Sequence, residues 1–292
     1  MTIETITVHT PDGRALAVDH GGDLTGHPII TCHGTPGNRQ LFDLIVNDAA
    51  ATGIHLIGYD RPGYGGSDPL PGRTVADCAI DVRAIAEAFS ADRIAVWGIS
   101  GGGPHALACA ALMPDLVCAV ASLASIAPYG PPDLDYFADM GQDNVDDIKL
   151  ELSDPEAARR KLALDRTEIL AANPDNFMDG FATLVSPADA AVLTGDLAAY
   201  LLATMVDGLA PSDEGWFEDG EAHLSNWGFD LESIAVPVQL WQGRQDKFVP
   251  FGHGAWLAKQ IPGVQAHLSD EDGHLTLMAR LPEIHQWLAA HF

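Results

Sequence analysis

The sequence predicts an α/β protein in which one mostly parallel sheet carries helices on both faces and is interrupted by a helical insertion. From residue 1 to about residue 125, short apolar runs alternate with helical patterns. The alternation stops for about a hundred residues that contain helical stretches and no convincing strand, and it resumes near residue 236. We therefore expect a core domain of residues 1–128 and 232–292 and a helical cap of residues 129–231. At 292 residues, two domains remain an alternative to one domain with a large insertion.

The strands are predicted from short apolar runs. Ile3–Val8 and Ala15–His20 flank the turn sequence Pro11-Asp12-Gly13, which indicates a hairpin. The later runs have the length and composition of strands that are buried on both faces of a parallel sheet. They are Pro28–Cys32, Ile54–Tyr59, Arg93–Trp97, Val117–Leu123, Val236–Trp241 and Val264–Leu268.

The helices are predicted from apolar spacing and from end signals. Thr74–Phe89 places its apolar residues in steps of three and four, which gives one apolar stripe. Asp154 followed by Pro155 is a typical helix start, with the aspartate as N-cap and the proline in the first turn. The other predicted helices are Gly101–Met113, Pro155–Ala172, Ala188–Gly208 and a last helix near Leu281–His291.

The charge excludes some classes of partner. The chain carries 15 basic and 41 acidic residues, a net charge of −26, which disfavours nucleic acid and anionic membranes. No apolar stretch is long enough for a membrane helix and the N-terminus lacks a signal-peptide pattern, so a cytoplasmic location is expected. Between residues 131 and 230, 22 acidic and 5 basic residues give a net charge of −17. This favours a solvated helical surface, with an acidic lid that prefers neutral or cationic substrates as the alternative.

The cysteines and histidines indicate no metal site. Cys32, Cys78, Cys109 and Cys118 are scattered, and none has metal-like spacing with histidine. A Cys32 nucleophile beside His33 is disfavoured, because nothing nearby would lower the thiol pKa. The chemistry proposed below requires no metal and no organic cofactor.

The strongest chemical signal is Gly98-Ile99-Ser100-Gly101-Gly102. It matches the G-x-S-x-G pattern, follows a predicted strand and opens a predicted helix. Such a sharp turn crowds the residues two before and two after the serine, and Gly98 and Gly102 relieve that crowding. Ser100 is therefore the candidate nucleophile, and a glycine-rich turn with an idle serine is the alternative.

The loop after the strand Pro28–Cys32 reads His33-Gly34-Thr35-Pro36-Gly37. Acyl transfer develops an oxyanion, which preorganised N–H donors stabilise. We expect the backbone N–H groups of Thr35 and Gly101 to form this oxyanion hole. His33 and Gly34 are expected to shape the loop, with His33 structural rather than the base.

We expect the base and the acid to follow the nucleophile in the chain. His274, in Asp270-Glu-Asp-Gly-His274, follows the last predicted strand, and histidine can accept a proton near neutral pH. Asp246 follows the preceding strand, 28 residues earlier, and is the candidate that orients His274. Asp270 and Asp272 are disfavoured because they share the loop of His274.

Together these motifs resemble the α/β-hydrolase superfamily, and within it the small bacterial capped serine hydrolases, which include esterases, lactonases, carbon–carbon bond hydrolases and proline iminopeptidases. The segment Tyr59–Ser67 is also similar to the loop after the family's fourth strand. The resemblance implies an eight-stranded sheet and a helical cap after strand six. The chain departs from haloalkane dehalogenases and epoxide hydrolases, whose elbow carries aspartate where this chain has Ser100. It also differs from typical proline iminopeptidases, with HGTPG for HGGPG and GISGG for GGSWG.

The expected function is hydrolysis of a small-molecule ester through an acyl-enzyme. An iminopeptidase-like aminopeptidase is an alternative, and it would need a cap carboxylate such as Asp143, Asp146 or Asp147. A lyase with the same triad and a non-catalytic ligand-binding protein are further alternatives. The expected partner is a small-molecule substrate, and a homodimer is compatible with the sequence. Candidate pocket residues from the cap are Tyr136, Phe137, Met140, Trp216, Phe217 and Trp227.

Overall fold

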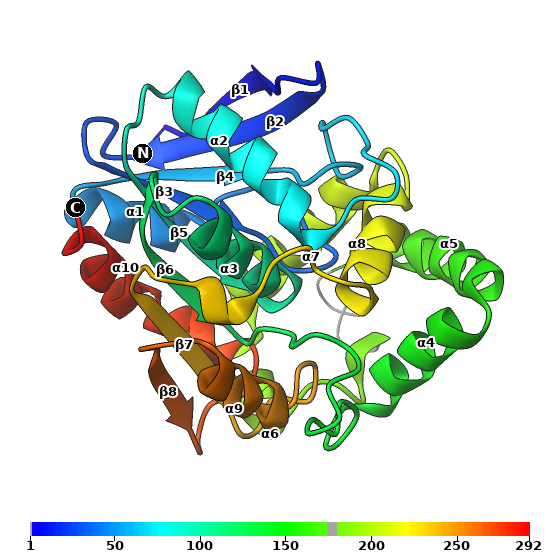
Figure 1. Ribbon diagram of the computed structural model, residues 1–292. Coiled ribbons are helices and arrows are strands. Elements are labelled where there is room, and N and C mark those ends of the chain that lie inside the picture. The colour runs from blue at the N-terminus through cyan, green and yellow to red at the C-terminus, as the bar shows by residue number, and fades with distance from the viewer. Residues whose placement is uncertain (1, 174–179) are drawn as a thin grey trace.

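The computed structural model of the protein describes residues 2–173 and 180–292. Its centre is an eight-stranded sheet with the strand order β1-β2-β4-β3-β5-β6-β7-β8 (Figure 1). β1 pairs antiparallel with β2, and β2 pairs antiparallel with β4, whereas the other neighbouring strands are parallel. The predicted fold class, an eight-stranded mostly parallel sheet with helices on both faces, is confirmed.

The strands end within two residues of their predicted bounds. They are β1 (Glu4–His9), β2 (Ala15–Gly22), β3 (His27–Cys32), β4 (Ile54–Tyr59), β5 (Ile94–Ile99), β6 (Val117–Leu123), β7 (Val238–Gly243) and β8 (Gln265–Ser269). The α-helices are α1 (Asp43–Ala51), α2 (Cys78–Ala88), α3 (Gly103–Leu112), α4 (Gln142–Ser153), α5 (Pro155–Ala171), α6 (Pro187–Val192), α7 (Gly195–Leu209), α8 (Glu214–Leu224), α9 (Phe251–Gln260) and α10 (Leu281–Ala289).

The central strands are apolar because helices cover both of their faces. In β5, Ile94 and Val96 pack into one core cluster with residues of α2, α3 and α9. Ala95 and Trp97 point the other way, into a cluster with residues of α1 and α10. Figure 1 shows these two helical layers on opposite sides of the sheet. Successive residues of a strand face opposite sides, so a strand covered on both sides needs an unbroken apolar run.

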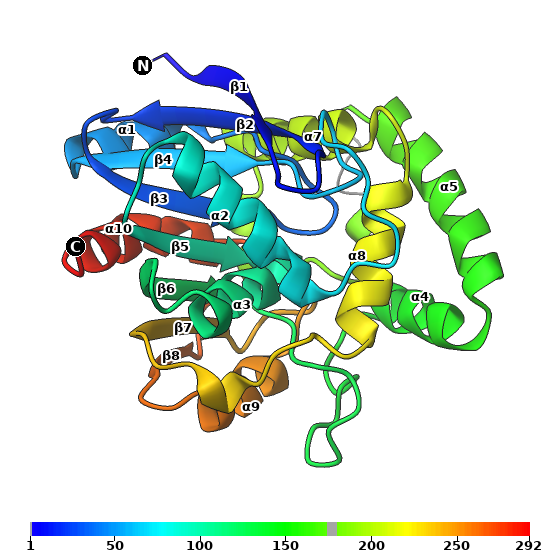
Figure 2. The ribbon, with the colours of Figure 1, turned by 45° about the horizontal axis from the view of Figure 1, so that its top comes forward.

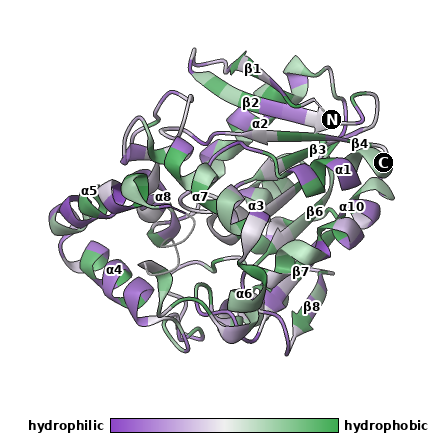
Figure 3. Ribbon diagram, turned by 180° about the vertical axis from the view of Figure 1, so that it is seen from behind, coloured by the Kyte–Doolittle hydropathy of each residue, from purple (hydrophilic) through white to green (hydrophobic). Residues whose placement is uncertain are grey.

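The chain between β6 and β7 carries α4 to α8 and, in its described residues, no strand. Figure 2 shows α4, α5 and α8 beyond the carboxyl ends of the parallel strands, on the side away from both termini. In Figure 3 the outer helices α4 and α5 carry many hydrophilic residues, and α5 has no buried residue. We keep the name cap for residues 129–231, whose bounds as a separate domain remain a prediction.

Two predictions about cap helices have different outcomes. The start of α5 is confirmed, because Asp154 is its N-cap and accepts a hydrogen bond of 3.0 Å from the Ala157 N–H. The single helix predicted over Ala188–Gly208 is wrong. That segment forms α6 and α7, separated at Leu193 and Thr194, and Gly195 begins α7 with a positive φ of 52°. This left-handed backbone cannot continue a right-handed helix.

No helix in residues 2–173 and 180–292 is both long and apolar enough to cross a lipid bilayer.

Candidate active site

The predicted nucleophile lies on a strained turn between β5 and α3. Ser100 has a φ of 56°, which is rare for a residue with a side chain and is typical of a nucleophile elbow. A Cβ atom on Gly98 would lie 2.2 Å from the Gly102 carbonyl oxygen. A Cβ atom on Gly102 would lie 2.1 Å from the Cys32 carbonyl oxygen. Both clashes are with backbone atoms, so only glycine fits at these two positions.

The structure brings His274 and Asp246 together. The His274 Nδ1–H donates a hydrogen bond of 2.9 Å to Asp246 Oδ2. The other carboxylate oxygen of Asp246 accepts from the N–H groups of Phe248 (2.9 Å) and Val249 (2.8 Å), and Gln242 Nε2 donates to Oδ2 at 3.1 Å. Because Nδ1 is occupied by Asp246, Nε2 is the ring nitrogen that remains for proton transfer.

The electrostatic surroundings of His274 favour its protonated form. The side chain is almost completely buried, and burial alone would lower its pKa. The carboxylates of Asp246 and Asp189 outweigh burial, so the pKa of His274 is raised above its usual value. A raised pKa makes the neutral imidazole a stronger proton acceptor, which suits a general base.

Ser100 and His274 line the same cavity, which has a volume of about 1130 Å³. Within the described part of the chain, no hydrogen bond joins the Ser100 hydroxyl to His274. Catalytic hydrogen bonds are often long or poorly aligned before substrate binds. The contact between His274 and Asp246 is therefore formed, whereas a hydrogen bond between Ser100 and His274 is not formed among the described residues.

The two predicted oxyanion-hole residues are neighbours in space. A Cβ atom on Gly101 would lie 2.2 Å from Thr35 Oγ1, so the loop after β3 packs directly on the elbow. His33 donates from Nδ1 to the Gly34 carbonyl (2.7 Å), and its Nε2 accepts from the Arg61 N–H (3.2 Å). Burial, assisted by the Arg61 charge, lowers the pKa of His33 well below its usual value. His33 is thus a neutral ring that holds its own loop.

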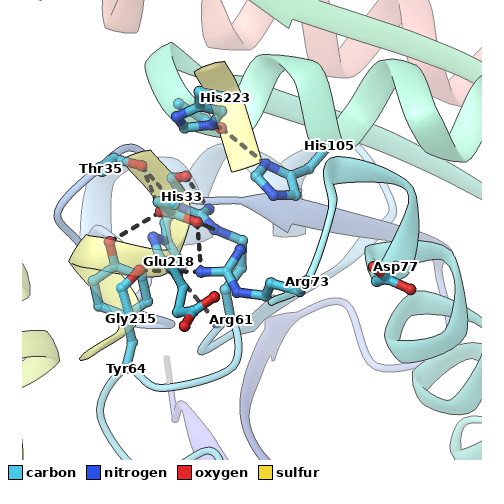
Figure 4. Close-up of polar contacts among 12 residues, drawn as sticks. His33, Thr35, Arg61, Tyr64, Arg73, Asp77, His105, Gly215, Glu218 and His223 are labelled. Carbon is cyan, nitrogen blue, oxygen red and sulfur yellow. Dashed lines mark hydrogen bonds and ion pairs between the residues drawn. The ribbon is translucent and has the colours of Figure 1, made fainter. Parts of the chain in front are cut away.

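A buried ionic cluster that the sequence analysis missed joins this loop to the cap (Figure 4). Arg61, which is fully buried, donates to the carbonyl oxygens of His33 and Gly34 and to Thr35 Oγ1. Thr35 Oγ1 in turn donates a hydrogen bond of 2.6 Å to Asp219 Oδ2. Asp219 belongs to α8, so one cap helix is tied to the candidate oxyanion loop.

Asp219 is the centre of this cluster. Its carboxylate faces Arg61 Nη2 at 2.5 Å and Arg73 Nη2 at 2.7 Å, and it accepts a hydrogen bond of 2.9 Å from the Tyr64 hydroxyl. Burial would raise the pKa of Asp219, but the two guanidinium groups prevail and hold it well below its usual value. Arg61 and Tyr64 lie in the Tyr59–Ser67 segment that resembles a family loop, but nothing distinguished Asp219 among the many acidic residues of the cap.

Two further histidines hold the elbow itself. His105 Nδ1 and His223 Nε2 donate to the Gly101 carbonyl oxygen at 2.9 Å and 3.0 Å. His105 lies in the first turn of α3 and His223 lies in α8. Burial lowers the pKa of His223 to about 4, so both rings act as neutral hydrogen-bond donors at neutral pH.

The cavity wall combines apolar and acidic residues. Of the six predicted lining residues, Tyr136, Met140, Trp216 and Phe217 line it. Trp227 is instead buried in the core, where it stacks on Phe229, and Phe137 packs against Tyr129 and Tyr136 rather than lining the cavity. Acidic residues of the cap also line the cavity, namely Asp143, Asp146, Asp147, Glu151, Asp165 and Glu168.

The cysteines are inert in this structure. Cys32, Cys78, Cys109 and Cys118 are buried free thiols. Burial raises the pKa of Cys32 far above its usual value, so this thiol does not form a nucleophilic thiolate at neutral pH. Over the residues that the structure describes, no group of three or more His, Cys, Asp or Glu side chains is arranged to hold a metal ion.

Comparison with known proteins identifies the family. The sequence pattern of the family described as alpha/beta hydrolase fold matches residues 27–280. The chain is 28% identical over 239 residues to the AB hydrolase superfamily protein YisY of Bacillus subtilis (strain 168), covering 81% of this chain and 80% of that protein. It is 26% identical over 251 residues to a non-heme chloroperoxidase of Streptomyces lividans, covering 85% of each.

The structure is also similar to the esterase RhEst1 from Rhodococcus sp. ECU1013, with a TM-score of 0.70, 20% identity and 99% of each chain covered. At this identity the likeness shows the fold alone. The family pattern, in contrast, spans well over half of the chain. The protein therefore belongs to the alpha/beta hydrolase fold family, and this membership supports a hydrolase.

Proposed function

We propose that the protein is a serine hydrolase that cleaves a carboxylic ester bond of a small molecule. The observation that carries this proposal is the meeting of two motifs on the wall of one cavity. Ser100 stands on a strained elbow, and His274 is already paired with Asp246. A nucleophile, a base and an orienting acid in this relation are the components of acyl transfer.

In the proposed reaction, Ser100 Oγ attacks the ester carbonyl carbon while His274 Nε2 removes the hydroxyl proton. Asp246 stabilises the imidazolium that forms. The N–H groups of Gly101 and Thr35 hold the oxyanion, and each such donor is worth about 3–4 kcal/mol in the transition state. His274 then protonates the departing alkoxide, which leaves an acyl group on Ser100. Water activated by His274 releases the acid and restores the serine.

The cavity supports a substrate of drug-like size. A volume of about 1130 Å³ is slightly above the usual range for small-molecule sites, roughly 300–1000 Å³. Its wall includes Ile99, Leu275 and Met278, which suit an apolar acyl group. Acidic residues of α4 and α5 also line the wall and favour a substrate that is neutral or cationic.

An aminopeptidase is the second candidate, and one observation favours it. Glu151 lines the cavity, its Oε1 has no hydrogen-bond partner among the described residues, and burial with the nearby Glu221 and Asp147 raises its pKa to about 7. A free amino terminus could pair with this carboxyl group. Ester cleavage remains the first candidate because the elbow and loop motifs differ from those of typical proline iminopeptidases.

The test compares the protein and its Ser100→Ala variant on two panels, nitrophenyl esters of increasing chain length and aminoacyl arylamides that include proline. We expect ester hydrolysis that falls by at least a thousandfold in the variant, because the nucleophile of related triads is worth about 10⁶ in kcat. Serine-dependent arylamide hydrolysis alone would move the assignment to the aminopeptidase. Turnover of neither panel above the variant would contradict both, in favour of a lyase or a ligand-binding protein.

A further inference from the structure

One buried carboxylate of the cap reaches the loop that carries the proposed base. Asp189 lies in α6 and its side chain has no exposed surface. The Ser186 hydroxyl, at the N-cap of this helix, donates to Asp189 Oδ2 at 2.8 Å. Asp189 is therefore fixed from its own side, by the first turn of the helix that carries it.

The remaining acceptor capacity of Asp189 is used by the backbone around His274. The N–H of His274 donates to Oδ2 at 3.1 Å, and the N–H of Leu275 donates to Oδ1 at 2.7 Å. The N–H of Thr276 also points to Oδ1, at 3.3 Å. Three consecutive N–H groups on one carboxylate fix the orientation of the peptide planes on either side of the base.

The sequence of the loop of residues 270–276, which carries His274 and is called the base loop below, fits this contact. A Cβ atom on Gly273 would lie 2.4 Å from Asp189 Oδ2, so the residue before His274 must be glycine for the carboxylate to enter. The Gly273 N–H donates a hydrogen bond of 2.8 Å to Thr276 Oγ1. The loop and the cap carboxylate are therefore shaped to each other.

We propose that Asp189 is a positioning residue that holds the backbone of the base loop from the cap and adds a second negative charge beside His274. This inference rests on the proposed function and deepens it, because it assigns to the cap a part in presenting the base. Asp246 orients the imidazole ring, whereas Asp189 fixes the main chain from which the ring extends.

Few charged groups besides Asp189 influence the pKa of His274, so the contribution of Asp189 to this pKa can be measured. Asp246, between β7 and α9, and Asp189, on α6, are the two carboxylates that raise the pKa of His274. Asp272, on the base loop, is paired with Arg280 at 2.9 Å, which offsets its charge. His253, on α9, has a pKa lowered by burial and is neutral at neutral pH. Loss of the Asp189 charge should therefore lower the pKa of His274 while Asp246 still holds the ring.

The test is the titration of His274 in the wild type, in Asp189→Asn and in the matched control Ser186→Ala. Asparagine removes the charge and keeps one acceptor oxygen, while Ser186→Ala disturbs the same helix turn and keeps the carboxylate. His274 is followed in two ways, by the acidic limb of the pH profile of kcat/KM for a nitrophenyl ester and by its ring signals in an NMR titration. The NMR titration requires no activity, so it tests Asp189 even if the protein cleaves no ester.

In Asp189→Asn we expect both midpoints to move to lower pH by about 0.5–1 unit, as for the removal of a nearby opposite charge. In Ser186→Ala the midpoints should stay within about 0.2 unit of wild type. An unshifted midpoint in Asp189→Asn, or equal shifts in the two variants, would overturn the proposal. If Asp189→Asn does not fold, Asp189→Ser is used with the same two criteria. Wild-type protein without serine-dependent turnover but with the NMR shift would contradict only the proposed function.

Discussion

The buried cluster around Asp219 gives the sharpest prediction for stability. Asp219→Asn keeps the size of the side chain but leaves Arg61 and Arg73 without their common counter-charge. Arg61 is fully buried, Arg73 is 5% exposed, and both contact Asp219 directly. Removal of one partner of a buried ion pair typically costs about 3–5 kcal/mol, because the remaining charge is uncompensated.

This free energy converts into a shift of the melting temperature. At about 2.1 cal/mol/K per residue, a chain of 292 residues has an unfolding entropy of about 0.6 kcal/mol/K. A loss of 3–5 kcal/mol therefore lowers Tm by about 5–8 °C. Because the folded-state pKa of Asp219 is depressed, its contribution is complete above the unfolded pKa and is lost as pH falls through the folded value. The difference between wild type and variant should be constant near neutral pH and should narrow below about pH 4.

Differential scanning calorimetry of wild type, Asp219→Asn and Glu214→Gln measures this effect. Glu214 lies on the same helix, and its only described ion pair is the exposed contact with Arg159 at 3.8 Å. Its loss should cost at most about 0.5 kcal/mol, or less than about 1 °C. In the folded Asp219→Asn variant, kcat for an ester should also fall by about tenfold to a hundredfold, since Thr35 loses an anchor. A Tm within 1 °C of wild type would refute the reasoning.

Two further predictions concern the elbow and the acidic cap. Gly102→Ala should abolish folding or serine-dependent turnover, because the new Cβ would meet the Cys32 carbonyl oxygen at 2.1 Å. The control is Gly252→Ala, where the atom nearest to the new Cβ is 4.0 Å away. Similar Tm and activity in the two variants would argue against the tight packing at Gly102. An anionic nitrophenyl ester should show a higher KM than a neutral ester of the same shape at low salt, because acidic cap residues line the cavity, and the gap should shrink as ionic strength rises. Equal KM values at low salt would remove the electrostatic role of the cap.

The core of the fold could be predicted from the sequence because its central strands are buried on both faces. Apolar runs such as Ile54–Tyr59 and Val117–Leu123 leave few alternatives, and both appear with their predicted bounds. The cap was harder to predict, since an outer helix such as α4, which buries only Val145, shows a weak apolar pattern. Helices α4 and α8 were not identified by their residues. α6 was joined to α7 across Leu193 and Thr194, because the Gly195 that follows them can also stand within a helical pattern, and its positive φ of 52° appears only in the structure.

The candidate site was predicted unevenly for a related reason. Ser100, His274 and Asp246 lie in local patterns whose place at strand ends can be read from the chain, and the structure brings the latter two into contact. Asp189 and Asp219 have no such pattern. They are two of 22 acidic residues between residues 131 and 230, and their burial is decided by contacts with Arg61, Arg73 and the base loop, which are distant in the sequence. Only the folded chain distinguishes them from solvated carboxylates.

Covalent labelling tests most directly whether Ser100 is an activated nucleophile, because it requires no knowledge of the substrate. The folded protein is treated with an aryl phosphonate ester, and the labelled peptide is located by mass spectrometry. We predict one adduct, on Ser100, that is absent in Ser100→Ala and forms at least about a hundredfold more slowly in His274→Ala, since the triad acts as a unit. Folded wild-type protein that remains unlabelled, or labelling of Ser100→Ala at the wild-type rate, would contradict the assignment.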